Sequence, residues 1–264
     1  MSRIAICSLR IGERYREITK YAPVNKQQYC DKHGYTYIED DSVYDPSRHP
    51  AWSKLHLLIK HLENWDYLVW MDADLFIMNP DWAIGHFIKY LGNNADVMVG
   101  SDWKMSNTGI MFCRNTPWTM DFLKAILNNK DYPIVGNYEQ DSFQDLFARN
   151  VMDSKDHVKV ITRPEEINSY WFNYHRGQWI LHCAGCRGEA LALMMNRYCP
   201  CRMEEDSDES YAARMLWLEA EYRVHADNLL EQERRSYDKP VESTPDPTPE
   251  VSGNEGVNIQ NEIL

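Results

Sequence analysis

Short apolar runs alternate with amphipathic stretches along most of the chain. The apolar runs predict buried β-strands at residues 3–9, 67–71, 96–100, 109–113, 158–161 and 179–182, with a half-buried strand at residues 35–39. Apolar positions at helical spacing predict helices at residues 14–32, 51–62, 118–127 and 140–149. Strands that alternate with helices predict an α/β fold, with a mainly parallel, mixed sheet between two layers of helices.

The last part of the chain differs from the rest. Residues 203–238 are predicted to form a C-terminal amphipathic helix, and residues 239–264, rich in proline and acidic residues, a disordered tail. Nearly all of the net charge of −12 arises in this part, because it holds 16 acidic and 5 basic residues, a balance of −11, against 24 and 23 in residues 1–202, a balance of −1. Residues 1–202 are therefore predicted to be a nearly neutral folded domain, without the basic surface of a nucleic-acid-binding protein.

Hydropathy and cysteine content indicate the cellular compartment in which the protein is expected. No stretch approaches the roughly 20 apolar residues that cross a bilayer, and the first residues become polar too soon for a signal peptide. We therefore expect a cytoplasmic protein. The seven cysteines favour reduced thiols over a disulfide framework. A zinc site formed by Cys183, Cys186, Cys199 and Cys201 is an alternative, although the second pair is more closely spaced than structural zinc sites require.

Asp72-Ala73-Asp74 directly follows the apolar run at residues 67–71. The carboxyl end of such a strand is where α/β sheets place ligand sites. Two neighbouring carboxylates repel each other there unless a cation compensates them, so the motif predicts an Mg²⁺ or Mn²⁺ site able to hold a diphosphate. An acidic turn without a metal is the alternative.

A second segment offers a third ligand for this cation. His182 ends a predicted strand, and its imidazole would favour Mn²⁺. Gly185 would let the backbone approach a phosphate, and Arg187 could neutralise one. A hydrogen-bonded core histidine is the alternative for His182.

Two further polar clusters are candidates for ligand contacts. Asn107 and Gly109 precede a predicted strand and could face a hydroxyl-rich ligand, although an ordinary turn explains them equally well. Glu139, Gln140 and Asp141 open a predicted helix, where acidic residues are common as caps. They could instead face the carbon at which a reaction occurs.

Taken in order, these segments resemble a glycosyltransferase with the GT-A fold, a Rossmann-like architecture. More narrowly, they resemble the family of fungal α-galactosyl- and α-mannosyltransferases and plant xyloglucan xylosyltransferases. The resemblance spans residues 3–190. It is carried by Tyr21-Ala22, Asn25-Lys26, Tyr29, His33-Gly34-Tyr35, Trp52-Ser53-Lys54, Trp70-Met71-Asp72-Ala73-Asp74, Asn107-Thr108-Gly109, Glu139-Gln140-Asp141 and His182-Cys183-Ala184-Gly185-Cys186-Arg187.

The resemblance implies a metal-dependent hexosyl- or pentosyltransferase that uses Mn²⁺ or Mg²⁺. Its donor would be a nucleotide sugar, with UDP as the nucleotide, and its acceptor a hydroxyl of a glycan or glycoprotein. The family retains the anomeric configuration. Its eukaryotic members carry an N-terminal membrane anchor, whereas this chain begins at its first predicted strand, which suggests a bacterial, viral or otherwise cytosolic version.

Individual roles follow from the positions that match. Asp72, Asp74 and His182 match the metal ligands. Gln140 matches the glutamine beside the donor sugar, which suits front-face attack, and Glu139 and Asp141 fall in the acceptor region. Arg187 stands where the family has lysine. Lys54 would add to stabilisation of the diphosphate. Leu9 and Arg10 begin the loop that is expected to contact the base of the nucleotide.

Three alternatives remain open. Glu139 or Asp141 could act as a covalent nucleophile, as in retaining glycosidases. The chain could be a non-catalytic interaction module on a transferase-like core. It could also be a phosphohydrolase with Asp72 as its nucleophile, although Leu75 and Phe76 do not fit that motif.

Overall fold

The computed structural model describes residues 2–101, 106–129 and 138–200 of the chain. Its strands are β1 (Ile4–Ser8), β2 (Thr36–Glu39), β3 (Tyr67–Met71), β4 (Leu75–Ile77), β5 (Val97–Gly100), β6 (Asn107–Arg114), β7 (Val158–Ile161) and β8 (Ile180–His182). Its α-helices are α1 (Glu13–Ile18), α2 (Tyr21–His33), α3 (Ser53–His61), α4 (Ile84–Ile88), α5 (Pro117–Asn128), α6 (Glu139–Ala148), α7 (Ser154–His157) and α8 (Gly188–Arg197). Single 3-10 turns lie at Asp41–Val43, Pro50–Trp52, Leu62–Asn64, Lys89–Leu91, Val151–Asp153 and Pro164–Glu166.

The main sheet is mixed and has β3 near its centre. Within the described residues its strand order is β2-β1-β3-β6-β5-β7. Strand β1 is parallel to β2 and β3, β5 is parallel to β7, and β6 is antiparallel to both of its neighbours. Strand β3 is paired on both sides, and its last four residues are buried. Burial on both faces explains why its sequence is apolar without alternation.

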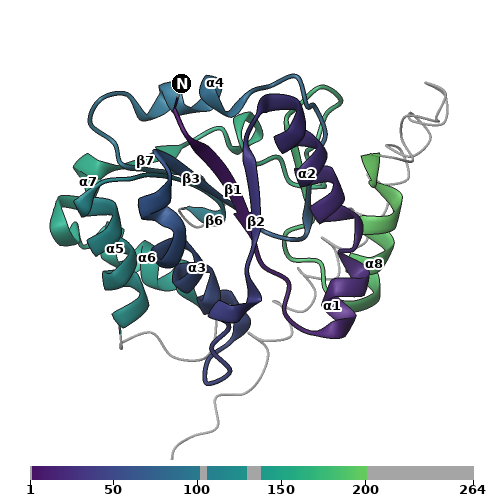
Figure 1. Cartoon of the computed structure of the whole chain (residues 1–264), viewed down its shortest axis with the longest axis horizontal. Helices are drawn as coiled ribbons and strands as arrows, with labels where there is room; N and C mark the ends of the chain where they lie inside the picture. Colours follow the sequence, from purple (N-terminus) through teal and green to yellow (C-terminus); the bar gives the residue numbers. More distant parts are fainter. Residues whose placement is uncertain (1, 102–105, 130–137, 201–264) are drawn as a thin grey trace, which may run out of the picture. The chain divides into compact units, whose positions relative to one another are not determined.

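Helices cover both faces of this sheet (Figure 1). Ala5 and Cys7 of β1 belong to the apolar core shared with α3, α5 and α6. Ile4 and Ile6 point the other way, into the core shared with α2, α4 and the small antiparallel sheet formed by β4 and β8. The predicted three-layer α/β/α fold around a mixed sheet is therefore confirmed.

Several element boundaries differ from the prediction. The helix predicted at residues 14–32 is divided into α1 and α2 at Thr19, whose hydroxyl donates to the Tyr15 carbonyl at 2.7 Å. This local hydrogen bond competes with continuation of the helix. Helix α2 ends at Gly34, as predicted, in the left-handed conformation at φ 69° that glycine adopts without strain. Elements β4, α4, α7 and α8 were not predicted; β4, α4 and α7 are too short to show a periodicity.

The predicted helix at residues 203–238 and the predicted tail at residues 239–264 lie outside the described residues. No helix in the described part of the chain is both long enough and apolar enough to span a membrane. Among the described residues, five cysteines are free thiols: Cys7, Cys30, Cys113, Cys183 and Cys186. Cys199 forms a disulfide, so the expectation of reduced thiols is wrong at this position, and its sulfur is not available as a zinc thiolate.

Candidate active site

The main sheet and the small sheet bring the Asp-x-Asp motif and His182 together. Asp72 directly follows β3, and its backbone N–H donates to the Gly109 carbonyl of β6 at 2.8 Å. Asp74 directly precedes β4, which pairs with β8 so that Leu75 lies opposite His182. The N–H of Cys183 then donates to the Asp74 carbonyl at 2.9 Å. The position of the imidazole beside the two aspartates is therefore a consequence of β4–β8 pairing.

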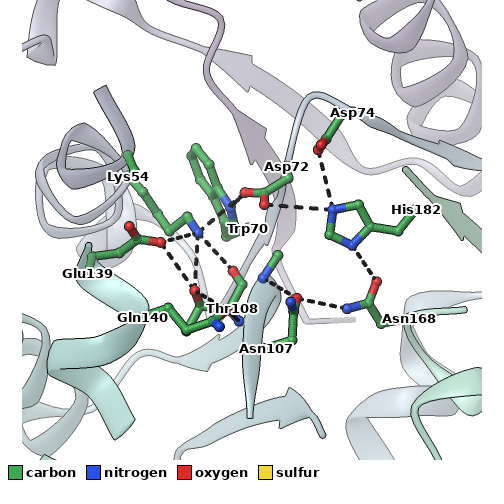
Figure 2. Close-up of polar contacts among 12 residues, drawn as sticks. Lys54, Trp70, Asp72, Asp74, Asn107, Thr108, Glu139, Gln140, Asn168 and His182 are labelled. Carbon is green, nitrogen blue, oxygen red and sulfur yellow. Dashed lines mark hydrogen bonds and ion pairs between the residues drawn. The ribbon is translucent and has the colours of Figure 1, made fainter. Parts of the chain in front are cut away.

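Asp72, Asp74 and His182 offer one ligand atom each, and these atoms lie within 4.8 Å of one another. Figure 2 shows the two carboxylates facing the imidazole. Nε2 of His182 is 3.3 Å from Oδ1 of Asp74 and 3.8 Å from Oδ2 of Asp72. Ligands at about 2.1 Å from one cation can be up to about 4 Å apart, so the two separations from Nε2 fit a small divalent ion bound between His182 and each aspartate. Two carboxylates and an imidazole also fit the chemistry of Mn²⁺.

The carboxylate of Asp72 is held in one orientation. Its Oδ1 accepts a hydrogen bond from the Trp70 indole at 2.6 Å and lies 3.3 Å from the Lys54 ammonium. Its Oδ2 is the oxygen on the side of His182. The two oxygens thus have different environments, and Oδ2 is the one placed to act as a ligand.

Several neighbours lower the pKa of Asp74 in a largely buried position. Burial opposes its charge, but its contacts with His182, a backbone hydrogen bond and Lys26 together hold the pKa of Asp74 below its usual value. Lys26 lies fully buried nearby, and its ammonium donates to the Leu75 carbonyl at 3.4 Å. Burial lowers the pKa of Lys26 to about 8, although attraction to Asp74 partly opposes this effect.

A buried ion pair lies on the other side of Asp72. The Lys54 ammonium donates to Oε1 of Glu139 at 2.7 Å and to the carbonyl of Thr108 at 3.0 Å. Burial opposes the charge on Lys54, but Asp72 and Glu139 outweigh it and hold the pKa of Lys54 above its usual value. Oε2 of Glu139 has no hydrogen-bond partner within the described residues.

A pocket of about 850 Å³ contains this group of side chains. The candidate site residues that line it are Leu9, Lys54, Asp72, Ala73, Asp74, Asn107, Glu139, Gln140, His182, Gly185 and Arg187. Gly185 has φ 81°, a conformation that favours glycine, and Arg187 directly precedes α8. The volume of the pocket is large enough for a nucleotide-sized ligand, and its lining combines acidic, amide and cationic groups.

Three candidate residues, Arg10, Gly109 and Asp141, are not among those that line the pocket. Arg10 donates to both carboxylate oxygens of Glu39, at 2.7 and 3.2 Å. Gly109 lies against the imidazole of His182, where a Cβ atom would approach Cε1 to 2.3 Å. Their predicted contacts with a ligand stay predictions.

Sequence reasoning missed two residues that hold the site together. Thr108 donates its N–H to Oε1 of Gln140 at 3.0 Å and its hydroxyl to Oε1 of Glu139 at 3.2 Å. Asn168 contacts Nδ1 of His182 at 2.9 Å. Thr108 lies inside a motif that was recognised, whereas no local pattern around Asn168 distinguishes it from an ordinary loop asparagine.

The architecture and the position of the acidic motif define a GT-A fold. A solved glycosyltransferase, described as involved in the glycosylation of the major capsid of PBCV-1, is similar to this chain with a TM-score of 0.61. The alignment covers 74% of this chain and 99% of that one at 17% sequence identity. The predicted GT-A fold is confirmed.

Sequence comparisons point to the same class of enzyme. A family model described as "Protein of unknown function, DUF273" matches residues 26–136. Probable glycosyltransferase 4 of Oryza sativa subsp. indica is 30% identical over 111 residues, which cover 38% of this chain and 23% of the relative. Xyloglucan 6-xylosyltransferase 1 of Arabidopsis thaliana is 29% identical over 111 residues, covering 38% and 24%.

The chain thus spans about a quarter of the length of these curated relatives. These relatives are named as a probable glycosyltransferase and a xyloglucan 6-xylosyltransferase. The predicted resemblance to GT-A glycosyltransferases and to the xyloglucan xylosyltransferase family is confirmed.

Proposed function

We propose that this chain is a metal-dependent glycosyltransferase that moves a sugar from a nucleotide diphosphate sugar, with UDP as the nucleotide, to a hydroxyl of a glycan. The observation that carries the proposal is the convergence of Asp72, Asp74 and His182 inside the pocket of a GT-A fold. Their separations suit one divalent cation. The names of the sequence relatives support the same reaction class.

The donor diphosphate has a binding region of suitable charge beside the three ligands. A divalent cation held by Asp72, Asp74 and His182 would supply Lewis-acid stabilisation to the leaving diphosphate. Arg187 and Gly188 line the pocket at the N-terminus of α8, where backbone N–H groups and the helix dipole favour an anion. Arg187 would therefore bind a phosphate together with the start of this helix.

Lys54 has a different role from a direct phosphate contact in this proposal. Its ammonium is surrounded by Glu139, Thr108 and Asp72, and its side chain is only 4% exposed. It pairs with the carboxylates of Asp72 and Glu139, at 3.3 and 2.7 Å, and holds them in place. Oε2 of Glu139, which has no partner in the part of the chain that the structure describes, is then available to accept a hydrogen bond from a sugar hydroxyl.

Front-face transfer with retention fits the polar groups of the pocket better than a covalent nucleophile. Gln140 lines the pocket, and the Thr108 N–H holds its side-chain oxygen at 3.0 Å. Such a group can orient the sugar without forming a bond to it. Of the two alternative nucleophiles, Asp141 is not among the pocket-lining residues, and Glu139 is engaged by Lys54.

The proposal is tested first by donor binding. Thermal unfolding of the full chain is measured with a panel of nucleotide sugars, with and without Mn²⁺. A donor raises the midpoint only when it binds the folded state, and the increase should require Mn²⁺. A non-catalytic interaction module would show no such shift with any nucleotide sugar.

Turnover of the donor identified in this way is then compared between variants. Asp74→Asn should abolish both Mn²⁺ binding and sugar transfer while leaving the unfolding midpoint of the metal-free protein close to wild type. Asp81→Asn is the matched control, because Asp81 is an exposed residue paired with Lys32 and is not among the pocket-lining residues. Undiminished transfer by the wild-type chain in EDTA, without added metal, contradicts the proposal.

A further inference from the structure

A chain of hydrogen bonds connects the backbone of β6 to the imidazole of His182 (Figure 2). The Gly109 N–H donates to Oδ1 of Asn107 at 2.8 Å. Nδ2 of Asn168 donates to the same oxygen at 3.0 Å. Oδ1 of Asn168 lies 2.9 Å from Nδ1 of His182. We call Asn107 and Asn168 the amide pair.

The donor and the acceptor of each of these hydrogen bonds follow from the first bond, between Gly109 and Asn107. A backbone N–H can only donate, so the atom of Asn107 that faces Gly109 must be the carbonyl oxygen. The atom of Asn168 that faces this oxygen must then be the amide nitrogen. The other end of the Asn168 amide is therefore its oxygen, which can only accept. Nδ1 of His182 must consequently carry a hydrogen.

From this order of donors and acceptors we infer that the amide pair fixes the tautomer of His182 and so keeps its Nε2 lone pair available for a metal ion. Nε2 is the nitrogen that faces Asp74 and Asp72, at 3.3 and 3.8 Å. The inference rests on the proposed function in one respect, namely that these three residues bind a divalent cation. Asn107 and Asn168 are positioning residues in this scheme, since they act through His182.

Burial and backbone hydrogen bonds restrict the position of the His182 imidazole. His182 is 2% exposed and Asn168 is fully buried. The His182 N–H donates to the Ser169 carbonyl at 2.8 Å, and its carbonyl accepts from the Trp171 N–H at 2.9 Å, so the backbone is held as well. The His182 ring packs directly against Gly109, which has no side chain there; a Cβ atom would lie 2.3 Å from Cε1. The buried Nδ1–H therefore depends on Asn168 for its partner, since an unpaired buried donor is costly.

The first experiment measures Mn²⁺ affinity without any nucleotide sugar, by titration calorimetry or by electron paramagnetic resonance of free Mn²⁺. Asn168→Leu removes the acceptor of the Nδ1 hydrogen, and the affinity should fall about 10- to 100-fold, as for other partners of metal-binding histidines. Asn107→Leu leaves the Asn168 amide without its orienting contact and should lower the affinity less.

Three comparisons separate this role from a loss of stability. Asn107→Asp keeps an oxygen acceptor towards both Gly109 and Asn168, so Mn²⁺ affinity should stay within a few fold of wild type. Asn115→Leu removes a hydrogen bond to the Glu63 carbonyl at the opposite end of β6 and should leave Mn²⁺ affinity unchanged. The double variant Asn107→Leu/Asn168→Leu should bind no more weakly than Asn168→Leu, because one residue acts through the other.

The tautomer itself is observable by long-range ¹H–¹⁵N NMR of the metal-free wild-type chain, with the imidazole neutral. Nδ1 of His182 should give a pyrrole-type signal and Nε2 a pyridine-type signal. The reverse pattern overturns the inference, as does wild-type Mn²⁺ affinity in Asn168→Leu. Failure of the wild-type chain to bind Mn²⁺ would instead contradict the proposed function, and the NMR result would still decide the tautomer.

Discussion

The buried pair of Lys54 and Glu139 allows a quantitative test of how the site is held. Both side chains are about 5% exposed or less, and the ammonium lies 2.7 Å from the carboxylate. Replacement of Lys54 by methionine keeps an unbranched side chain of nearly the same length and removes the charge. It leaves the carboxylates of Glu139, whose side chain is 5% exposed, and of Asp72, whose side chain is 30% exposed, without their shared cation.

The expected loss follows from this burial. Removing one partner of a buried ion pair costs about 3–5 kcal/mol, because the remaining charge is not compensated. Glu139→Gln should cost only about 1.5 kcal/mol, the lower end of the contribution of a hydrogen bond to a charged group. Lys54 retains Asp72 at 3.3 Å and Thr108 in that variant.

The double variant Lys54→Met/Glu139→Gln tests the reasoning most directly. It removes both charges of the pair, so it should be more stable than Lys54→Met alone by at least about 1 kcal/mol, within the range of coupling between residues in contact. The assay is equilibrium urea unfolding at neutral pH in EDTA, with the free energy of unfolding obtained by linear extrapolation.

Lys60→Met is the matched control for the lysine substitution. Lys60 also pairs with an aspartate, Asp40, at 2.7 Å, but its side chain is 49% exposed. An exposed pair contributes at most about 1 kcal/mol. If Lys54→Met costs no more than Lys60→Met, or if the double variant is less stable than Lys54→Met, the charges of the pair do not stabilise the fold in the way described.

Two further predictions concern other positions. Gly109→Ala should lower Mn²⁺ affinity and cost about 1–3 kcal/mol of stability, because its Cβ would lie 2.3 Å from Cε1 of His182; Gly85→Ala, with open space around it, should do neither, and a fall in Mn²⁺ affinity there would contradict this. Hydrogen bonds from Lys60, Ser42 and His61 hold the pKa of Asp40 below its ordinary value of 3.8. Asp40 therefore contributes stability above that pH, which is lost as the pH falls through its folded-state pKa. In urea unfolding between pH 7 and 2, the difference between wild type and Asp40→Asn should shrink below about pH 4, and a constant difference would contradict the assignment.

The sequence alone determined those features that depend on local patterns. An unbroken apolar run predicted β3 as a buried strand, and the acidic residues directly after it placed Asp72 and Asp74 at the end of that strand. Gly34 predicted the end of α2, because few other residues adopt its left-handed conformation. Alternation of strands and helices was sufficient for the α/β class, since the period of apolar residues reflects which faces are buried.

Only the tertiary structure decided how the site is assembled. His182 reaches the aspartates because β8 pairs with β4, a strand too short to be recognised from its own residues. Lys54 lies against Glu139, and Asn168 reaches Nδ1 of His182, through contacts between segments far apart in the chain. Propensity and periodicity act over one element, whereas these hydrogen bonds and ion pairs depend on how several elements pack. For that reason the candidate ligands could be named from the sequence, but the residues that orient them could not.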